Sequence, residues 1–346
     1  MFPLNQWYVA GFTWELEDKP LARTYLGQPV VLFRTGSGAV AALEDRCCHR
    51  NLPLSSGMLD EGGIRCGYHG LLYAPNGRCI EIPGQEKIPV KACVRAYRVE
   101  VRNQIIWIWM GQSDGAGAIT EPIGAPPEVP THDDPRYQFK GGTYHYDAPY
   151  QLIHDNLLDL SHVGYVHSKT IGGNPKAHME ASNAVTSDAE SVRVVRFLKA
   201  SEPPATYLAV WPFKGKVDRW MEIDFHVSHL NIFTGAVDVD TESLEDPRRG
   251  GLHIRGFHGV TPETATTSHY FWTIAKSFHP DKPDSLEALY QQTAMTFLED
   301  KTIIEAQYRN MCQFGEGPMI DIHVDVGPNR ARRIIKARSE GDKTIT

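Results

Sequence analysis

The stretch CCHRNLPLSSGMLDEGGIRCGYH, residues 47–69, decides how the first part of this chain must fold. Cys47 and His49 are separated by one residue, sixteen residues follow, and Cys66 and His69 are then separated by two. Two thiolates and two imidazoles on two loops suit either a structural zinc ion or an iron–sulfur cluster with mixed ligands. The stretch therefore predicts a metal centre rather than disulfides.

The pairing of the ligands separates these two kinds of site. In a Rieske [2Fe–2S] centre one iron is bound by two cysteines and the other by two histidines. Each of the two loops here offers one cysteine and one histidine. Zinc sites more often begin with two cysteines spaced Cys-x₂₋₄-Cys. The pattern favours a [2Fe–2S] cluster, with a zinc knuckle as the alternative; the expected ligands are Cys47, His49, Cys66 and His69. Cys48 is expected to be a packed thiol, and Cys79, Cys93 and Cys312 to lie in the core or at partly buried sites.

The chain divides into two domains and a linker by its composition. Short runs of β-forming residues separated by turns predict a small all-β domain over residues 1–120. Closely spaced prolines predict a linker over residues 121–136. Residues 137–346 are expected to form a second, catalytic domain.

The pattern of that second domain predicts an α+β fold. A helix is expected over residues 148–167, strands from about 192 to 278, and a long amphipathic helix from about 285 to 311. Antiparallel strands combined with helices make a two-layer domain.

A second group of metal-ligand residues lies in the first of these helices. Asp159 and His162 are three positions apart and would share a helix face. His162 and His167 are five apart, and Gly164 between them would let the helix distort and bring both imidazoles to one ion. Two histidines and a carboxylate form the facial triad of an oxygen-activating iron(II) ion.

Asp300 is the candidate for the carboxylate. Its helical neighbours three or four positions away are apolar: Phe297, Ile303 and Ile304. A carboxylate on a buried stripe is costly unless a cation accompanies it, and iron would serve. By the same geometry Glu299 and Glu305 are expected on the solvated face of the helix.

Charge and hydropathy exclude several other classes of protein. With 35 basic and 42 acidic residues the net charge is -7, which argues against a nucleic acid or an anionic membrane surface as partner. The longest apolar run, residues 105–110, is too short to span a bilayer, and no signal peptide is visible at the N-terminus. A cytoplasmic protein is expected.

Both groups of metal-ligand residues, taken together, resemble those of Rieske non-haem iron oxygenases. The segment Asn-x-x-Asp-x-x-His-x₄-His at 156–167 resembles their iron-binding helix, and the segments 5–10, 66–71 and 82–85 resemble oxygenases of the vanillate O-demethylase type. The resemblance implies a helix-grip catalytic domain, in which an antiparallel sheet curves around a substrate cavity. It also implies a homotrimer in which electrons pass from His69 of one subunit through Asp159 to His162 of the next. By position, Asn231 and His258 match substrate-contacting residues of the family, and Asn156 is a further candidate. The alternative for Asn231 and His258 is that they are ordinary polar residues inside a sheet.

The expected function is a monooxygenase that uses O₂ to hydroxylate or demethylate a substituted aromatic compound. Electrons from NAD(P)H would come through a separate flavin and iron–sulfur reductase, with or without a ferredoxin, because the chain has no Gly-x-Gly-x-x-Gly nucleotide loop. Three alternatives remain: a ring cis-dihydroxylating dioxygenase, an electron carrier without oxygenase activity, and a zinc-stabilised ligand-binding protein. No paired Arg/Lys clamp for a carboxylate or sulfonate stands out in the sequence.

Overall fold

The computed structural model describes residues 2–341, except 114–118, 169, 247, 280, 283, 316 and 318. The chain forms two compact units: residues up to Glu128 together with Thr261–Ala265 form the first, and Val129–Val260 with the residues from Thr266 onward form the second. The boundary after Glu128 lies inside the segment expected as a linker. Within the described residues, no helix is both long and apolar enough to cross a membrane.

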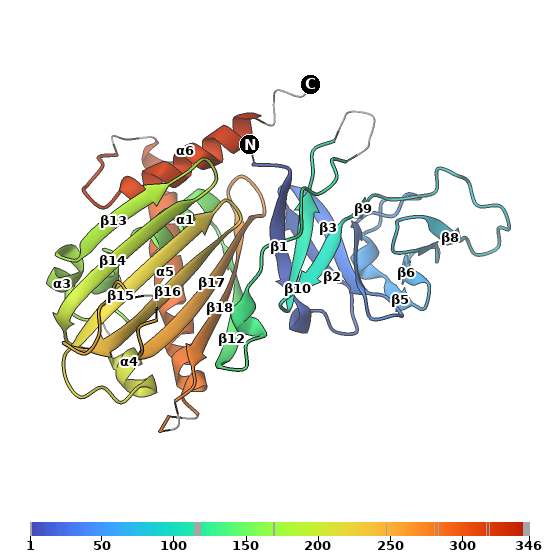
Figure 1. Cartoon of the computed structure of the whole chain (residues 1–346). Coiled ribbons are helices and arrows are strands. Elements are labelled where there is room, and N and C mark those ends of the chain that lie inside the picture. Colours follow the sequence, from blue (N-terminus) through green and yellow to red (C-terminus); the bar gives the residue numbers. More distant parts are fainter. Residues whose placement is uncertain are drawn as a thin grey trace. The chain divides into compact units, whose positions relative to one another are not determined.

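The first unit is built from β-strands, as predicted. Its described residues contain short 3₁₀ turns but no α-helix, and the strands form three sheets, of order β1-β11-β10, β2-β3-β4-β9 and β5-β6-β7-β8 (Figure 1). The strands are β1 (Gln6–Phe12), β2 (Leu21–Tyr25), β3 (Gln28–Arg34), β4 (Val40–Glu44), β5 (Met58–Asp60), β6 (Gly63–Arg65), β7 (Leu72–Tyr73), β8 (Cys79–Glu81), β9 (Ala96–Tyr97), β10 (Val99–Arg102) and β11 (Ile105–Met110). A hydrophobic cluster that includes Leu54, Ile64 and Tyr73 surrounds Cys47 and Cys66.

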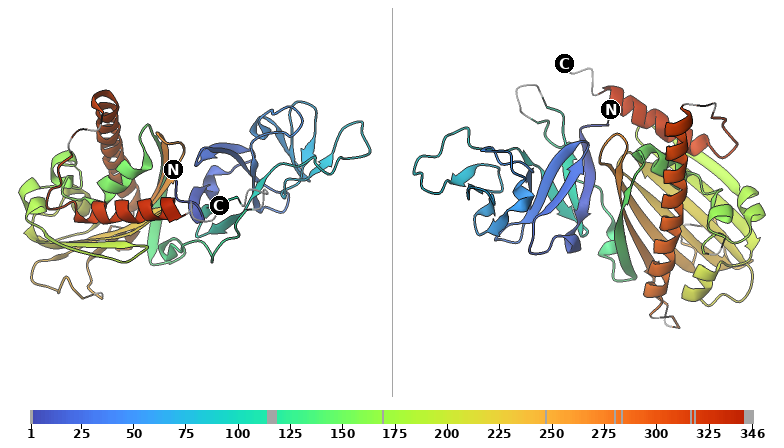
Figure 2. Two further views of the ribbon diagram at one scale, coloured as in Figure 1. Left: turned by 90° about the horizontal axis from the view of Figure 1, so that it is seen from above. Right: turned by 180° about the vertical axis from the view of Figure 1, so that it is seen from behind.

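The second unit contains a seven-stranded antiparallel sheet of order β12-β18-β17-β16-β15-β14-β13. Its strands are β12 (Tyr137–Tyr146), β13 (Ser182–Ser187), β14 (Val192–Ser201), β15 (Val217–His226), β16 (His229–Asp238), β17 (Leu252–Pro262) and β18 (Ser268–Ser277). Its helices are α1 (Tyr150–Leu158), α2 (Val163–Val166), α3 (Pro175–Met179), α4 (Ala205–Val210), α5 (Ser285–Phe314) and α6 (Val326–Gly341). The long helix α5 crosses one face of the sheet (Figures 1 and 2). This confirms the α+β prediction for the catalytic domain.

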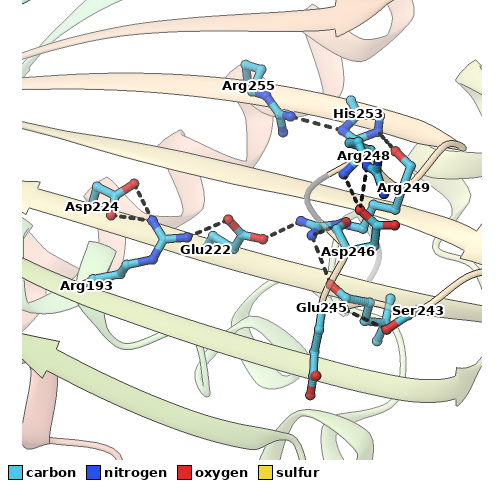
Figure 3. Close-up of polar contacts among 11 residues, drawn as sticks. Arg193, Glu222, Asp224, Ser243, Glu245, Asp246, Arg248, Arg249, His253 and Arg255 are labelled. Carbon is cyan, nitrogen blue, oxygen red and sulfur yellow. Dashed lines mark hydrogen bonds and ion pairs between the residues drawn. The ribbon is translucent and has the colours of Figure 1, made fainter.

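The opposite face of the sheet carries a network of charged side chains (Figure 3). Glu222 of β15 accepts hydrogen bonds from Arg193 and Arg249, and Arg255 of β17 donates to His253 over 3.0 Å. Because alternate residues of a strand face opposite sides, the residues next to Glu222 point toward α5. The two faces therefore have different roles: one is a paired, charged surface, and the other is covered by helices.

The prediction of a single helix over residues 148–167 is wrong. Helix α1 ends at Leu158, Asp159 adopts an extended backbone (φ −105°, ψ 96°), and α2 begins at Val163. The carboxylate of Asp159 accepts a hydrogen bond from the backbone N–H of Ser161 over 2.8 Å, which offers the chain an alternative to helical bonding. Gly164 has a packing role instead, because a Cβ there would lie 2.5 Å from Cα of Pro175.

Three of the cysteines also differ from expectation. Cys79 is buried as predicted, but Cys48, expected to be a packed thiol, is exposed, and so are Cys93 and Cys312. Cys48 lies in the first cysteine–histidine loop, Cys93 in the loop between β8 and β9, and Cys312 in the last turn of α5. These three residues therefore lie at the surface rather than in the core.

Candidate metal centres and substrate cavity

The two cysteine–histidine loops of the first unit share one backbone hydrogen-bond pattern. The N–H of Cys47 donates to Leu52 O and its C=O accepts from Asn51; the N–H of Cys66 donates to Leu71 O and its C=O accepts from Gly70. Asn51 and Gly70 occupy the same place in their loops, and both have positive φ, of 59° and 74°. The two loops thus form a matched pair.

This pairing brings like ligands together. Cys47 and Cys66 are each 2 % exposed, and burial, together with a hydrogen bond from the Cys66 thiol to Cys47, raises the pKa of Cys66. The rings of His49 and His69 lie 4.6 Å apart at the exposed end of the loops. One pair of thiols and a separate pair of imidazoles fit the two irons of a Rieske cluster. In the described part of the chain, the sulfur and ring-nitrogen atoms of these four side chains do not all lie within 4.8 Å of one another. This spread disfavours a single zinc ion.

A second centre lies in the second unit, between α1, α2 and α5. Of the described residues, only His162, His167 and Asp300 bring three potential ligand atoms within 4.8 Å of one another. Nε2 of His167 and Nε2 of His162 lie 3.0 and 3.4 Å from Oδ1 of Asp300. The geometry fits two histidines and one carboxylate on one face of a metal ion, as in non-haem iron(II) sites.

The electrostatics of Asp300 favour a cation at this position. Burial alone would raise the pKa of Asp300, but hydrogen bonds and charge from His162 and His167 outweigh it and hold that pKa below its usual range. The carboxylate stays ionised inside the protein, where an unpaired negative charge is costly. A divalent metal between the three side chains would offset that cost.

Two neighbouring side chains orient residues of the triad. Nδ2 of Asn156 donates to Oδ1 of Asp300 over 3.0 Å, and Nδ1 of His167 lies 2.8 Å from Oε2 of Glu299. Glu299 was expected to be a solvated-face residue, and the structure corrects this: its carboxylate fixes the ring of His167 from behind. Glu305 is likewise paired, with Lys301 and the N–H of Asp147, whereas Ile303, expected on the buried stripe, is 50 % exposed.

Asp159 contacts His162 through its main chain. Nδ1 of His162 hydrogen-bonds to the carbonyl oxygen of Asp159, which leaves Nε2 directed toward Asp300. Asp159 and His162 also border a depression that includes Ile304, Gln307 and Arg332. Asp159 therefore orients His162 of the triad and borders the depression.

A cavity of about 110 Å³ begins at the metal triad and extends between the sheet and α5. A cavity of roughly 150 Å³ is known to hold one benzene ring, so the space suits a single ring. His258 lines it, with its Nδ1 2.7 Å from the hydroxyl of Tyr270, and burial lowers the pKa of His258 to about 3. Asn156 also lines the cavity. Asn231 does not: its strand neighbour Ile232 faces the cavity, so Asn231 points to the other side of the sheet.

One cavity residue escaped the sequence analysis. Arg219 of β15 lines the cavity and is 3 % exposed. It lies on the inward face of its strand among apolar residues, the same pattern that singled out Asp300. That pattern could have identified it.

Two family models match this chain. Residues 6–98 match the Rieske [2Fe–2S] domain, and residues 146–340 match the vanillate O-demethylase oxygenase C-terminal domain. The first covers the two cysteine–histidine loops and the second covers the triad and the cavity.

Individual proteins match the chain over nearly its whole length. The putative toluene-4-sulfonate monooxygenase system iron-sulfur subunit of Comamonas testosteroni is 39% identical, with 99% of each chain covered. The oxygenase component of dicamba O-demethylase from Stenotrophomonas maltophilia is 35% identical, with 88% of each chain covered. A crystal structure of dicamba monooxygenase with non-haem iron and dicamba aligns with a TM-score of 0.82 at 31% identity, covering 100% of this chain and 99% of the other.

Proposed function

Because this chain belongs to the vanillate O-demethylase type of Rieske oxygenases, whose members are oxidoreductases, we propose that it oxidises a methyl or other alkyl group on a substituted aromatic compound. The observation that carries the proposal is the position of the triad in the wall of a cavity suited to one aromatic ring. A C–H bond held in this cavity lies beside the ion that the triad would bind.

The chain supplies two metal sites for this reaction. Cys47, His49, Cys66 and His69 would hold the [2Fe–2S] cluster, and His162, His167 and Asp300 would hold iron(II). Together these groups supply single electrons and the activation of dioxygen. One oxygen atom enters the C–H bond, and the other leaves as water with two electrons and two protons. Hydroxylation of an O-methyl or N-methyl carbon gives a product that releases formaldehyde.

The protein's own side chains determine where the substrate lies. Apolar residues of α5 and of the sheet, Leu289, Phe297, Ile232, Ile254 and Ile274, exclude water from the ring. His258 stays neutral because burial lowers its pKa, so its imidazole can hydrogen-bond a polar substituent without bringing a charge into the cavity. Glu299 holds His167 in one orientation, with Nε2 facing Asp300.

The electron supply requires other chains. The relatives are named as oxygenase subunits or components, which supports a separate reductase that draws on NAD(P)H, with or without a ferredoxin. We further propose a homotrimer in which the exposed His69 of one subunit meets Asp159 of the next. The depression beside Asp159 supports this arrangement, since exposed apolar side chains such as Met319 and Ile320 line it.

The experiment that tests the function is a substrate panel with a surrogate reductase. Aryl methyl ethers, N-alkylanilides and methylarenes are supplied with NADH, and oxygen uptake, formaldehyde and alcohol products are measured. Formaldehyde or benzylic alcohol formed in step with oxygen uptake supports the proposal. A cis-diol product would instead assign ring dihydroxylation. Substitution of His162 by Ala should abolish turnover but leave the reduced cluster's EPR signal; unchanged turnover would remove His162 from the reaction. A wild-type protein whose cluster is reduced and reoxidised but which forms no product would favour a simple electron carrier.

A further inference from the structure

Tyr270 supports His258 in the wall of the cavity. Alternation along β17 turns Ile254, Gly256 and His258 toward the cavity. On the neighbouring strand β18, Tyr270 faces the same side as Ile274, which also lines the cavity. Tyr270 itself is 1 % exposed, so it acts on a bound molecule through His258 rather than directly.

Aromatic packing holds both rings in one orientation. The ring of Tyr270 lies edge-on to Tyr146 and to Phe297, at centroid distances of 5.7 and 5.5 Å. Phe297 also meets the imidazole of His258 edge-on, at 5.5 Å. A Cβ added at Gly256 would lie 2.7 Å from Nε2 of His258, so the glycine leaves the room that the imidazole occupies. The two rings are therefore fixed relative to each other.

One short hydrogen bond joins the two side chains. Nδ1 of His258 lies 2.7 Å from the hydroxyl oxygen of Tyr270. Burial keeps both groups uncharged, because it lowers the pKa of His258 to about 3 and raises the pKa of Tyr270 well above its usual range. A neutral imidazole carries one proton, so the bond has two possible directions. Either the tyrosine donates to Nδ1, or Nδ1 donates to the tyrosine.

The surroundings of the tyrosine hydroxyl decide this direction. If Nδ1 carried the proton, the oxygen of Tyr270 would accept it, and the hydrogen of the hydroxyl would need a second partner. Among the residues that the structure describes, His258 is the one side chain or carbonyl within hydrogen-bond distance of that hydroxyl. A buried hydroxyl that donates to nothing is unfavourable. The O–H of Tyr270 therefore donates to Nδ1, and the proton of the imidazole is on Nε2.

We propose that Tyr270 is a positioning residue that fixes His258 as the Nε2–H tautomer, so that His258 offers the substrate a hydrogen-bond donor and never an acceptor. Nε2 is the nitrogen left for a ligand, since Nδ1 is bonded to Tyr270. A substituent with an accessible oxygen can accept from Nε2–H, whereas a substituent that can only donate would bring two hydrogens together. This selection acts on neutral compounds as well as on charged ones. The proposal rests on the proposed function, because it concerns selection by the same cavity.

Equilibrium binding to the iron-loaded protein under anaerobic conditions tests this assignment without turnover. Calorimetric titration compares two pairs of neutral ligands with matched shapes. 4-Methylacetophenone has a carbonyl acceptor where 4-isopropenyltoluene has an alkene carbon, and indole has an N–H donor where indene has a methylene group. The wild type should bind the ketone about 3- to 10-fold more tightly than the alkene, the usual effect of one neutral hydrogen bond. It should bind indole no more tightly than indene.

Three variants locate the effect. Tyr270→Phe should reduce the preference for the ketone by about threefold and raise the affinity for indole relative to indene, because Nδ1 loses its donor and can carry the proton. His258→Phe should abolish the preference for the ketone, and adding Tyr270→Phe to it should change neither ratio. Tyr144→Phe is the matched control, since the hydroxyl of Tyr144 donates to the carbonyl oxygen of Ala294 instead. It should keep both wild-type ratios.

Infrared spectroscopy of the bound ketone, labelled with carbon-13 at its carbonyl, gives an independent readout. A hydrogen bond to the oxygen lowers the carbonyl stretching frequency. The band should lie lower in the wild type and in Tyr144→Phe than in His258→Phe, with Tyr270→Phe in between. A merely structural role of the Tyr270 hydroxyl would weaken all four ligands alike and would leave the two ratios and the band unchanged.

Wild-type ratios in folded Tyr270→Phe would overturn the proposal, as would wild-type protein that binds ketone and alkene equally or prefers indole to indene. Iron content and melting temperature establish folding; if Tyr270→Phe does not fold, the wild-type ratios and the infrared bands of the wild type and His258→Phe decide. Failure of the proposed function looks different. A ketone preference without any oxygen-coupled product would leave this donor in a protein that is not a monooxygenase, and oxygen-coupled products without the preference would leave a monooxygenase that lacks it.

Discussion

Nδ1 of His167 lies 2.8 Å from Oε2 of Glu299, the residue immediately before Asp300 on α5. Two successive residues of one helix thus contact the same candidate metal site in different ways. Asp300 offers an oxygen to the metal position, and Glu299 fixes the ring of the histidine that would bind there. Hydrogen bonds of this kind set the tautomer and direction of a ligand imidazole.

Glu299→Ala should weaken iron binding by about 10- to 100-fold, the usual effect of losing a residue that orients a metal ligand. Glu299→Gln should weaken it less, because its amide oxygen can still accept the hydrogen bond. Competition of each protein with a chelator for Fe(II) measures the affinity. Glu287→Ala, on the exposed first turn of the same helix, is the control and should bind iron normally. Equal affinities for Glu299→Ala and Glu287→Ala would remove Glu299 from the site.

Asp159→Asn should keep both metals and yet lose turnover. The main-chain carbonyl that orients His162 is unaffected, and the Asn side chain can still accept from the N–H of Ser161. The negative charge proposed to connect two imidazoles across the subunit boundary is lost. Metal analysis, the EPR signal of the reduced cluster and oxygen-coupled product formation together check this. Wild-type turnover in this variant would rule out the bridge.

Cys47→Ser and Cys48→Ser should behave differently although the residues are adjacent. Cys47 is buried, as is Cys66, whereas Cys48 is exposed, and its Sγ and backbone N lie 3.1 and 3.2 Å from the Tyr73 hydroxyl. Cys47→Ser should therefore purify without the visible absorption and acid-labile sulfide of the cluster, and Cys48→Ser should retain both. The reverse result would mean that the ligand in this loop is Cys48.

Acid should destabilise the second unit through His154. Burial lowers its pKa to about 3, against about 6.5 in an unfolded chain, so the unfolded state binds an extra proton between these values. The free energy of unfolding should fall as the pH drops below 6.5, by up to about 1.4 kcal/mol per pH unit from this residue.

His154→Phe should reduce that slope, because phenylalanine has no proton to bind and fills the space beside Phe225 and Tyr150. Urea unfolding at pH 7 and pH 5 measures the effect relative to wild type. His323→Phe, at an exposed position, is the control and should leave the slope as it is in the wild type. A slope as steep in His154→Phe as in the wild type would show that other groups dominate.

Much of the molecule could be predicted from local sequence because local spacing determines it. The spacing of cysteines and histidines identified the first centre, and alternation identified the strands. Asp300 was predicted to be buried because its helical neighbours Phe297 and Ile304 are apolar, and all three residues are buried in the structure. The same rule misplaced Ile303, which is half exposed, because the face of a helix that is covered depends on what packs against it.

The other predictions that were wrong or missing concern contacts between residues that are distant in sequence. Glu299 lies 132 positions from His167, so no local pattern connects them. The end of α1 at Asp159 depends on a side-chain hydrogen bond that competes with the helix, and spacing alone does not predict it. Asn231 and His258 belong to neighbouring strands, but the inward or outward direction of each is set by the register of the whole sheet.

Helix α5 divides its length between two environments. Its first half, through Leu289, Thr293 and Phe297, forms a wall of the cavity, while Ile303, Ile304 and Gln307 of its second half border the depression beside Asp159. Asp300 lies at the junction. Mutations in the first half can therefore remodel what the cavity accepts while the depression beside Asp159 stays unchanged. A lineage of such proteins can diversify the substrates of the cavity and keep that surface, because the two sets of residues lie on different halves of one helix.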